Sequence, residues 1–198
     1  QITPPVPSTE SPSKGKISLR TYYAKESDPQ KEYIEIMAAS KIEPILITGW
    51  TLRGKEGLDV IIGQGAYLPY SSQINQQSQI YMEPNATAII TTGQSPIGTS
   101  FRLNICTGHF NQFQKFFPSL PEECPAVPAD SVPLNYPAAC FNFVKNLSKC
   151  QMPANIPYET AIEIGNDCIL LLKETSNYNG CVSAHKNEEN IYKKEWRI

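Results

Sequence analysis

In this 198-residue chain, the side chains best suited to metal binding or nucleophilic catalysis are those of six cysteines and two histidines. No two cysteines form a C-x-x-C pair, and zinc ligands usually come in such close pairs, so the sequence does not fit a zinc site. Catalysis by cysteine would need a free thiolate beside His109 or His185. We expect the cysteines to form disulfides, which would leave no thiol for that chemistry. His109 is then expected to be structural and His185 to be an exposed surface residue.

The spacing of two predicted helices suggests how the cysteines pair. One helix is expected at 140–150 and the other from Asn166 to the Asn-Gly pair at 179–180, as two arms of an antiparallel hairpin. Bonded positions in such a hairpin share a midpoint in the sequence, which must lie in the loop at 152–165. The predicted disulfides are Cys140–Cys181, Cys150–Cys168 and Cys106–Cys124.

The acidic residues do not form the carboxylate pair of a glycosidase. Glu32 and Glu35 lie at odd spacing on a predicted strand, which places their side chains on opposite faces. The sequence also lacks a phosphate-binding loop, an EF-hand loop and a GxSxG elbow. We therefore expect a protein that is not an enzyme and that uses no cofactor or metal.

Two sequons are candidate glycosylation sites, Asn85-Ala-Thr87 and Asn146-Leu-Ser148. Asn85 lies in a predicted turn and is the better placed of the two.

The composition excludes some classes of protein. A net charge of −2 gives no basic surplus for binding nucleic acid. No run approaches the roughly 18 apolar residues that a membrane-spanning helix requires. Disulfides indicate an oxidising compartment, so we expect a secreted or cell-surface protein. Because no signal peptide precedes Gln1, we expect the sequence to be that of a mature chain.

Short β-rich segments separated by turns predict a mainly β protein with an antiparallel, immunoglobulin-like β-sandwich. The Pro84–Asn85 turn is expected to divide the run at 79–93 into a hairpin. The predicted strands lie at 16–24, 32–36, 45–52, 59–69, 79–93 and 101–105. The expected core residues are Ile34, Ile36, Ile45, Ile47, Trp50 and Leu52.

A disulfide-stapled helical insertion is expected to interrupt this sandwich. Its first helix carries Phe110, Phe113, Phe116 and Phe117 on one face and ends at Pro118. We expect that face to pack on the sandwich, with an aromatic ligand platform as the alternative. The predicted parts are a Pro/Ser-rich tail at 1–15, the sandwich at 16–105, the insertion at 106–192 and a returning strand at 193–198.

The order of EYIEI (32–36), ITGWTL (47–52) and PNATAIITTG (84–93) resembles the lamin-tail-domain family. The run SPIGTSFRLNICTGHFNQFQKF (95–116) and the closing EWRI resemble secreted bacterial lamin-tail-domain proteins of unknown function. The resemblance covers residues 14–105 and the last few residues, and it implies the immunoglobulin-like sandwich. In this family another pair of strands usually follows a segment like EWRI. This leaves two expectations: either the sandwich closes differently, or a strand is missing, which would leave an open sheet edge to which another chain could add a strand.

These observations favour a non-enzymatic extracellular structural or interaction module, as a subunit of a cell-surface or filamentous assembly. Its expected partners are proteins, including further copies of itself. The alternative is a carbohydrate- or ligand-binding module that uses exposed aromatic residues. The candidates for that role are Tyr67, Tyr70, Tyr81 and the helix that carries Phe110.

Overall fold

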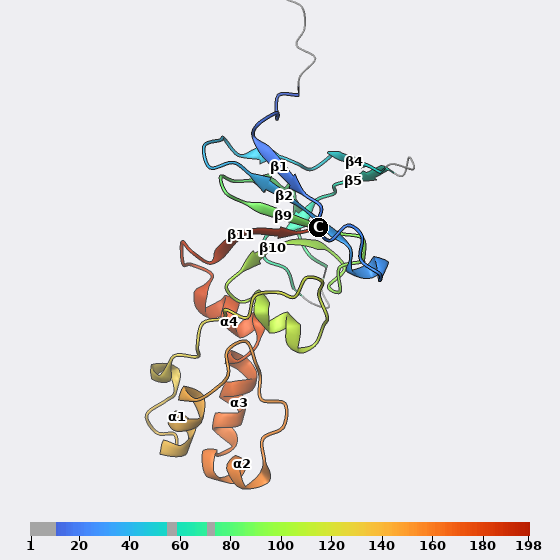
Figure 1. Cartoon of the computed structure of the whole chain (residues 1–198). Helices are drawn as coiled ribbons and strands as arrows, with labels where there is room; N and C mark the ends of the chain where they lie inside the picture. The colour runs from blue at the N-terminus through green and yellow to red at the C-terminus, as the bar shows by residue number, and fades with distance from the viewer. Residues whose placement is uncertain (1–10, 55–58, 71–73) are drawn as a thin grey trace, which may run out of the picture.

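The computed structural model describes residues 11–54, 59–70 and 74–198, so most of the predicted tail lies outside the described residues. A seven-stranded sheet forms one end of the molecule, and the α-helices extend from it to the other end (Figure 1). In spatial order the strands of the sheet are β1 (Ile17–Arg20), β2 (Tyr33–Ala38), β9 (Thr87–Thr91), β11 (Tyr192–Arg197), β10 (Ser100–Asn104), β6 (Gly65–Ala66) and β7 (Gln77–Ser78). Two further strand pairs are β3 (Ile45–Leu46) with β8 (Tyr81–Met82), and β4 (Thr51–Arg53) with β5 (Asp59–Ile61).

The sheet is mixed because β11 lies between β9 and β10. It runs parallel to β9 and antiparallel to β10, and β6 is also parallel to β10. The prediction of a wholly antiparallel arrangement is therefore wrong. It assumed that strands close in sequence would pair, whereas β11 returns from the end of the chain. The segment EWRI lies in β11, inside the sheet, and among the described strands the edges of the sheet are β1 and β7. This agrees with the expectation that the sheet closes differently from the family pattern.

One hydrophobic core lies between this sheet and the two strand pairs. Alternate residues of the sheet face it, including Ile36, Ala88 and Trp196, and Ile47, Ile80 and Met82 close it from the other side. Of the predicted core residues, Ile36 and Ile47 are fully buried. The other four are only half-buried at the border of this core: Ile34, Ile45, Trp50 and Leu52.

Two predicted strands are divided by turns. Gly49 has a φ of 87°, in the left-handed region, and separates β3 from β4 within the run at 45–52. The turn at Pro84–Asn85 is present, and Asn85 has a φ of 61°. The strands beside that turn do not form the predicted hairpin, because β8 pairs with β3 while β9 pairs with β2 and β11.

A second core covers the opposite face of the sheet. Phe101 packs edge-on against Phe110 and Phe116, with ring centroids 6.4 and 5.9 Å away. The aromatic segment therefore packs on the sheet as expected. It forms a 3₁₀ helix, η2 (Thr107–Gln112), and not the predicted helix to Pro118, so that Phe113 is 66% exposed.

The first three α-helices enclose a third core at the far end of the molecule, whereas the fourth packs beside the sheet in the second core (Figure 1). The short 3₁₀ helices are η1 (Pro29–Lys31) and η3 (Ala129–Ser131). The α-helices are α1 (Ala138–Lys145), α2 (Tyr158–Ile164), α3 (Asn166–Thr175) and α4 (Tyr178–His185). The predicted loop at 152–165 thus contains α2.

The helix predicted from Asn166 to the Asn-Gly pair is two helices. After α3 ends, the side chain of Asn177 caps α4 by accepting a hydrogen bond from the Gly180 amide at 3.0 Å. A Cβ atom on Gly180 would lie 2.1 Å from the carbonyl oxygen of Glu174, so only glycine allows α4 to begin so close to α3. The Asn-Gly pair that was predicted to end a helix therefore lies in the first turn of α4.

The predicted disulfide pairing is wrong in every pair. The structure has Cys106–Cys181, Cys124–Cys150 and Cys140–Cys168, and no cysteine is free. The prediction failed because it placed Cys150 and Cys181 on the arms of one hairpin. Cys150 lies beyond the end of α1, and Cys181 lies on α4, which packs beside the sheet in the second core.

Replacing Trp196 by alanine should lower the free energy of unfolding by about 3–5 kcal/mol, because its side chain is only 1% exposed and would leave a large cavity. Trp50→Ala is the matched control and should cost clearly less, since Trp50 is half-buried. Denaturant unfolding of both variants measures the difference. An equal or larger loss for Trp50→Ala would contradict this assignment of the core.

Gly108→Ala should destabilise the protein by about 1–3 kcal/mol through overpacking. The added Cβ would lie 2.5 Å from Cys150 Sγ and 2.6 Å from the Pro121 carbonyl oxygen. Gly63→Ala is the control, because a Cβ there meets nothing within 4 Å. Thermal or denaturant unfolding that ranks the two variants equally would show that the Cys124–Cys150 disulfide does not pack on Gly108.

Candidate functional site

A pocket of about 580 Å³ lies at the end of the sheet where β9 and β11 terminate. Because these two strands are parallel neighbours, their carboxyl ends lie at the same edge of the sheet. We call this pocket the basic pocket. It is lined by Gln30, residues 91–96, Phe101, residues 115–117, Arg197 and Ile198.

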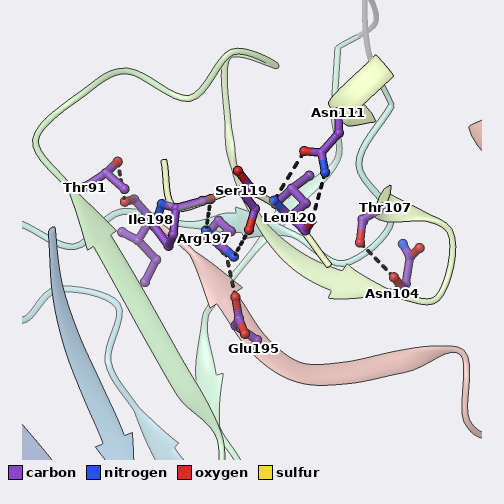
Figure 2. Close-up of polar contacts among 10 residues, drawn as sticks. Thr91, Asn104, Thr107, Asn111, Ser119, Leu120, Glu195, Arg197 and Ile198 are labelled. Atoms are coloured by element: carbon purple, nitrogen blue, oxygen red, sulfur yellow. Dashed lines mark hydrogen bonds and ion pairs between the residues drawn. The ribbon is translucent and has the colours of Figure 1, made fainter. Parts of the chain in front are cut away.

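Arg197 fixes one wall of the basic pocket (Figure 2). Its guanidinium donates to the carbonyl oxygens of Pro118 and Ser119, at 2.6 and 3.3 Å, and its Nε lies 2.7 Å from Glu195 Oε1. Burial lowers the pKa of Arg197, and the Glu195 carboxylate opposes that shift. A guanidinium stays protonated in proteins, so the pocket has a fixed positive charge paired with Glu195 in its wall.

Further hydrogen bonds lie on both sides of Arg197 (Figure 2). They join Asn111 to Leu120 on one side and Thr91 to Ile198 on the other. The Asn111 side chain donates to the Leu120 carbonyl at 2.8 Å and accepts from the Leu120 amide at 3.3 Å. At the opposite side, the Thr91 amide donates to the Ile198 carbonyl at 2.9 Å. The segment at 118–120 is thus held between η2 and the end of β11.

Lys115 provides a second positive charge in the lining of the basic pocket. Its Nζ lies 5.2 Å from the centroid of the Phe117 ring, and Lys31 Nζ lies 5.5 Å from the same centroid. Lys31 also forms an ion pair with Asp28 at 3.3 Å. Lys115 has no ion pair with a carboxylate in the described part of the chain, so its charge remains open to a ligand.

The lining of the basic pocket can bind a polar ligand. No aspartate or glutamate is among its lining residues, while Gln30, Thr92, Gln94 and Ser95 offer amide and hydroxyl groups. Ser95 Oγ is buried and has no hydrogen-bond partner among the described residues. No cluster of three or more His, Cys, Asp or Glu side chains that could hold a metal ion occurs in the described ranges.

The aromatic residues predicted for ligand binding do not form one platform. Tyr67 packs edge-on against Trp196 at 5.0 Å, and half-buried Tyr70 packs against Tyr178 at 6.0 Å. Phe110 is 4% exposed and stacks on Tyr178 in the second core. Tyr81 is 39% exposed on β8.

Arg102 also packs against Tyr67, so that this ring has structural contacts within the fold. Its guanidinium lies 5.7 Å from the Tyr67 ring centroid and 5.2 Å from that of Tyr192. It also forms two hydrogen bonds with Glu83, at 2.9 and 3.0 Å, and donates to the Lys193 carbonyl at 2.9 Å. This fully bonded cluster joins the end of β8 to β10 and β11.

Both histidines line a smaller cavity of about 130 Å³, together with Cys150 and Cys181. His109 is buried, and burial lowers its pKa, although a hydrogen bond with the Cys150 backbone acts in the other direction. His185 is half-buried, not exposed as expected, and its Nδ1 lies 2.6 Å from Glu188 Oε1.

Both sequon asparagines are at the surface. Asn85 is exposed in the turn before β9. Asn146 is exposed at the carboxyl end of α1, where its side chain donates to the Asn142 carbonyl at 2.9 Å. Their use as glycosylation sites stays a prediction.

Comparisons of the chain with models of protein families, with curated proteins and with solved structures found no match. None of the helices in the described ranges is both long enough and apolar enough to cross a membrane.

Sequence reasoning missed Arg197 and Lys115 as site residues. An arginine directly after Trp196 in a strand expected to be buried is a signal that this position has a specific polar partner. Lys115 gives no such signal, because its role depends on the fold that brings residue 115 beside β9 and β11.

Stability should fall with acidification through His109. Its folded-state pKa lies below the ordinary value of 6.5, so the unfolded state binds a proton more readily. The stabilising effect of the neutral ring is complete above pH 6.5 and is lost as the pH falls from there toward the folded-state pKa. His109→Gln should reduce the loss of unfolding free energy on acidification, as measured by denaturant unfolding at several pH values. His185→Gln is the control and should still show the loss that His109 causes. Parallel curves for the native protein and His109→Gln would contradict this role.

Proposed function

We propose that this chain is a non-enzymatic extracellular structural module that assembles head to tail with further copies of itself. The observation that carries the proposal is the pair of exposed apolar surfaces at opposite ends of the molecule, which have opposite charge. One surface lies on α2 and the other lies along β1 (Figure 1).

The α2 surface combines large apolar and acidic side chains. Tyr158 and Ile162 are 80% and 65% exposed, and their i, i+4 spacing puts them on one face of the helix. Glu159 and Glu163 are exposed on the same helix, which has no basic residue. A binding partner for this surface should offer apolar contacts surrounded by positive charge.

The β1 edge has that chemistry. Leu19 and Tyr22 are 57% and 86% exposed, and β1 pairs only with β2. The hollow beside β1 is lined by Lys14, Lys16 and Lys41 against one acidic residue, Glu43. An edge strand also offers backbone groups for hydrogen bonds with a second molecule.

A contact between two different surfaces of identical subunits does not close on itself unless the rotation forms a ring. Repetition of the α2–β1 contact would therefore extend into a filament or a surface layer. This agrees with the expected role as a subunit of a filamentous or cell-surface assembly.

The extracellular part of the proposal is supported by the three disulfides, since such bonds persist in oxidising compartments. We also propose that the β part is an immunoglobulin-like domain of lamin-tail type. Its support is the order of the three matching segments, which form β2, the β3–β4 region and the turn with β9.

The double variant Tyr158→Ser/Ile162→Ser should weaken self-association at least about tenfold. Sedimentation velocity at micromolar concentration measures it, and the association should decrease at high salt because opposite charges contribute. Leu134→Ser removes a residue that is 95% exposed elsewhere in the helical segment and should leave association unchanged. Glu159→Lys should weaken association, and Lys16→Glu in the same chain should restore part of it. A monomer under all these conditions would overturn the proposal.

A second candidate function is carbohydrate binding. It is favoured by the basic pocket, where aromatic rings, a lysine and several hydroxyl and amide groups line one concave site of the size that small ligands occupy.

A further inference from the structure

We infer that N-linked glycans on Asn85 and Asn146 control head-to-tail assembly, because each sequon lies beside one of the two contact surfaces. A glycan on Asn85 would cover the β1 edge, and a glycan on Asn146 would cover the α2 surface. This regulation rests on the proposed head-to-tail assembly, whereas the attachment of the glycans does not.

Asn85 lies beside the β1 surface. It is exposed and lines a hollow of about 410 Å³ whose wall includes Ile17 and Ser18 of β1. This hollow shares Ala39 and Ser40 with the lysine-lined hollow of the β1 surface. A saccharide attached to Asn85 therefore begins at the border of the proposed contact, and its bulk would keep a second molecule away from β1.

Asn146 lies beside the α2 surface. It is exposed at the carboxyl end of α1, and α1 and α2 pack together in the third core. Asn146 lines a hollow of about 670 Å³ together with Thr160 and Glu163 of α2. Glu163 is also one of the acidic residues of the α2 surface. A glycan on Asn146 would therefore stand where the lysine-rich β1 surface has to approach.

The modification is a transfer of saccharide to the asparagine amide from a lipid pyrophosphate-linked oligosaccharide. Nδ2 forms a bond to C1 of the first sugar and loses one proton, while the bond from C1 to the pyrophosphate oxygen breaks and the lipid pyrophosphate leaves. The hydroxyl of Thr87 or Ser148 completes each sequon. One N–H remains on Nδ2, so Asn146 can still donate to the Asn142 carbonyl.

Glycans beside separate surfaces would end growth as well as prevent it. A subunit that carries a glycan only on Asn85 keeps a free α2 surface, so it can add to the β1 end of an assembly. It then presents no free β1 surface to the next subunit. Since every internal subunit of a head-to-tail assembly uses both surfaces, such a subunit caps the end.

The test uses the full chain secreted by a eukaryotic host, as the native sequence, Asn85→Gly, Asn146→Gln and the double variant. Glycine suits position 85 because φ there is 61°. Mass spectrometry should find a glycan on each asparagine that has not been replaced. In sedimentation velocity at micromolar concentration, the double variant should self-associate at least about tenfold more strongly than the three glycosylated forms.

A mixture of the two single variants separates this regulation from a general effect of glycans. Asn146→Gln keeps the glycan beside β1 and has a free α2 surface, whereas Asn85→Gly keeps the glycan beside α2 and has a free β1 surface. Each should be a monomer alone, and together they should form a complex of one subunit of each that does not grow further. Native protein from a host that adds no N-linked glycans should associate like the double variant, which excludes an effect of the substitutions themselves.

Each contrary outcome overturns a defined part. Absence of a glycan from either asparagine of the native sequence would refute the assignment of that site. Equal association of the native glycoprotein and the double variant would refute the regulation and leave the assembly in place. If the double variant and the glycan-free native protein are both monomers, the head-to-tail assembly is refuted, and mass spectrometry still decides the modification. Self-association of one single variant alone would show that its glycan does not cover a contact surface.

Discussion

The hydrogen bonds of β11 to both β9 and β10 are the constraint on which the rest of the structure depends. Without β11 the sheet would separate into β1-β2-β9 and β10-β6-β7, which have no other strand in common. Adjacent residues of β11 also serve opposite faces, as alternation in a strand requires. Trp196 fills the core under the strand pairs, and Arg197 fixes the Pro118–Ser119 backbone on the other face. The side chains of β11 thus contribute to the packing on both faces of the sheet.

The position of β11 also determines how the helical segment is attached. Since β10 and β11 are antiparallel neighbours, the chain leaves the sheet and returns to it at the same place. The Cys106–Cys181 bond joins the segment near both of these points, with a sequence separation of 75 residues. By the chain-entropy model, closing a loop of this length contributes about 4 kcal/mol. This disulfide therefore helps to bring the chain back to the sheet, where it forms the central strand β11.

Local patterns in the sequence predicted some elements and failed where pairing is non-local. Alternation around Ile36 and the turn at Pro84–Asn85 are local signals, and both features occur in the structure. The parallel contact of β11 with β9 joins residues more than a hundred positions apart, for which one sequence contains no signal. The disulfide prediction failed because a break at Ser176 redirects Cys181 toward the sheet. The basic pocket could not be predicted, because its lysine, loop and arginine meet only after these pairings form.

The Cys106–Cys181 bond has a consequence for a chain that a protease has cut. The exposed chain around Leu134 is a natural place for a protease to cut. A nick there would leave two fragments, and the second would carry β11, the centre of the sheet. The Cys106–Cys181 and Cys124–Cys150 bonds both cross the cut, so that the nicked molecule would keep its central strand until a reductant separates the pieces. The disulfides that anchor the helical segment therefore also keep a cleaved chain in one piece.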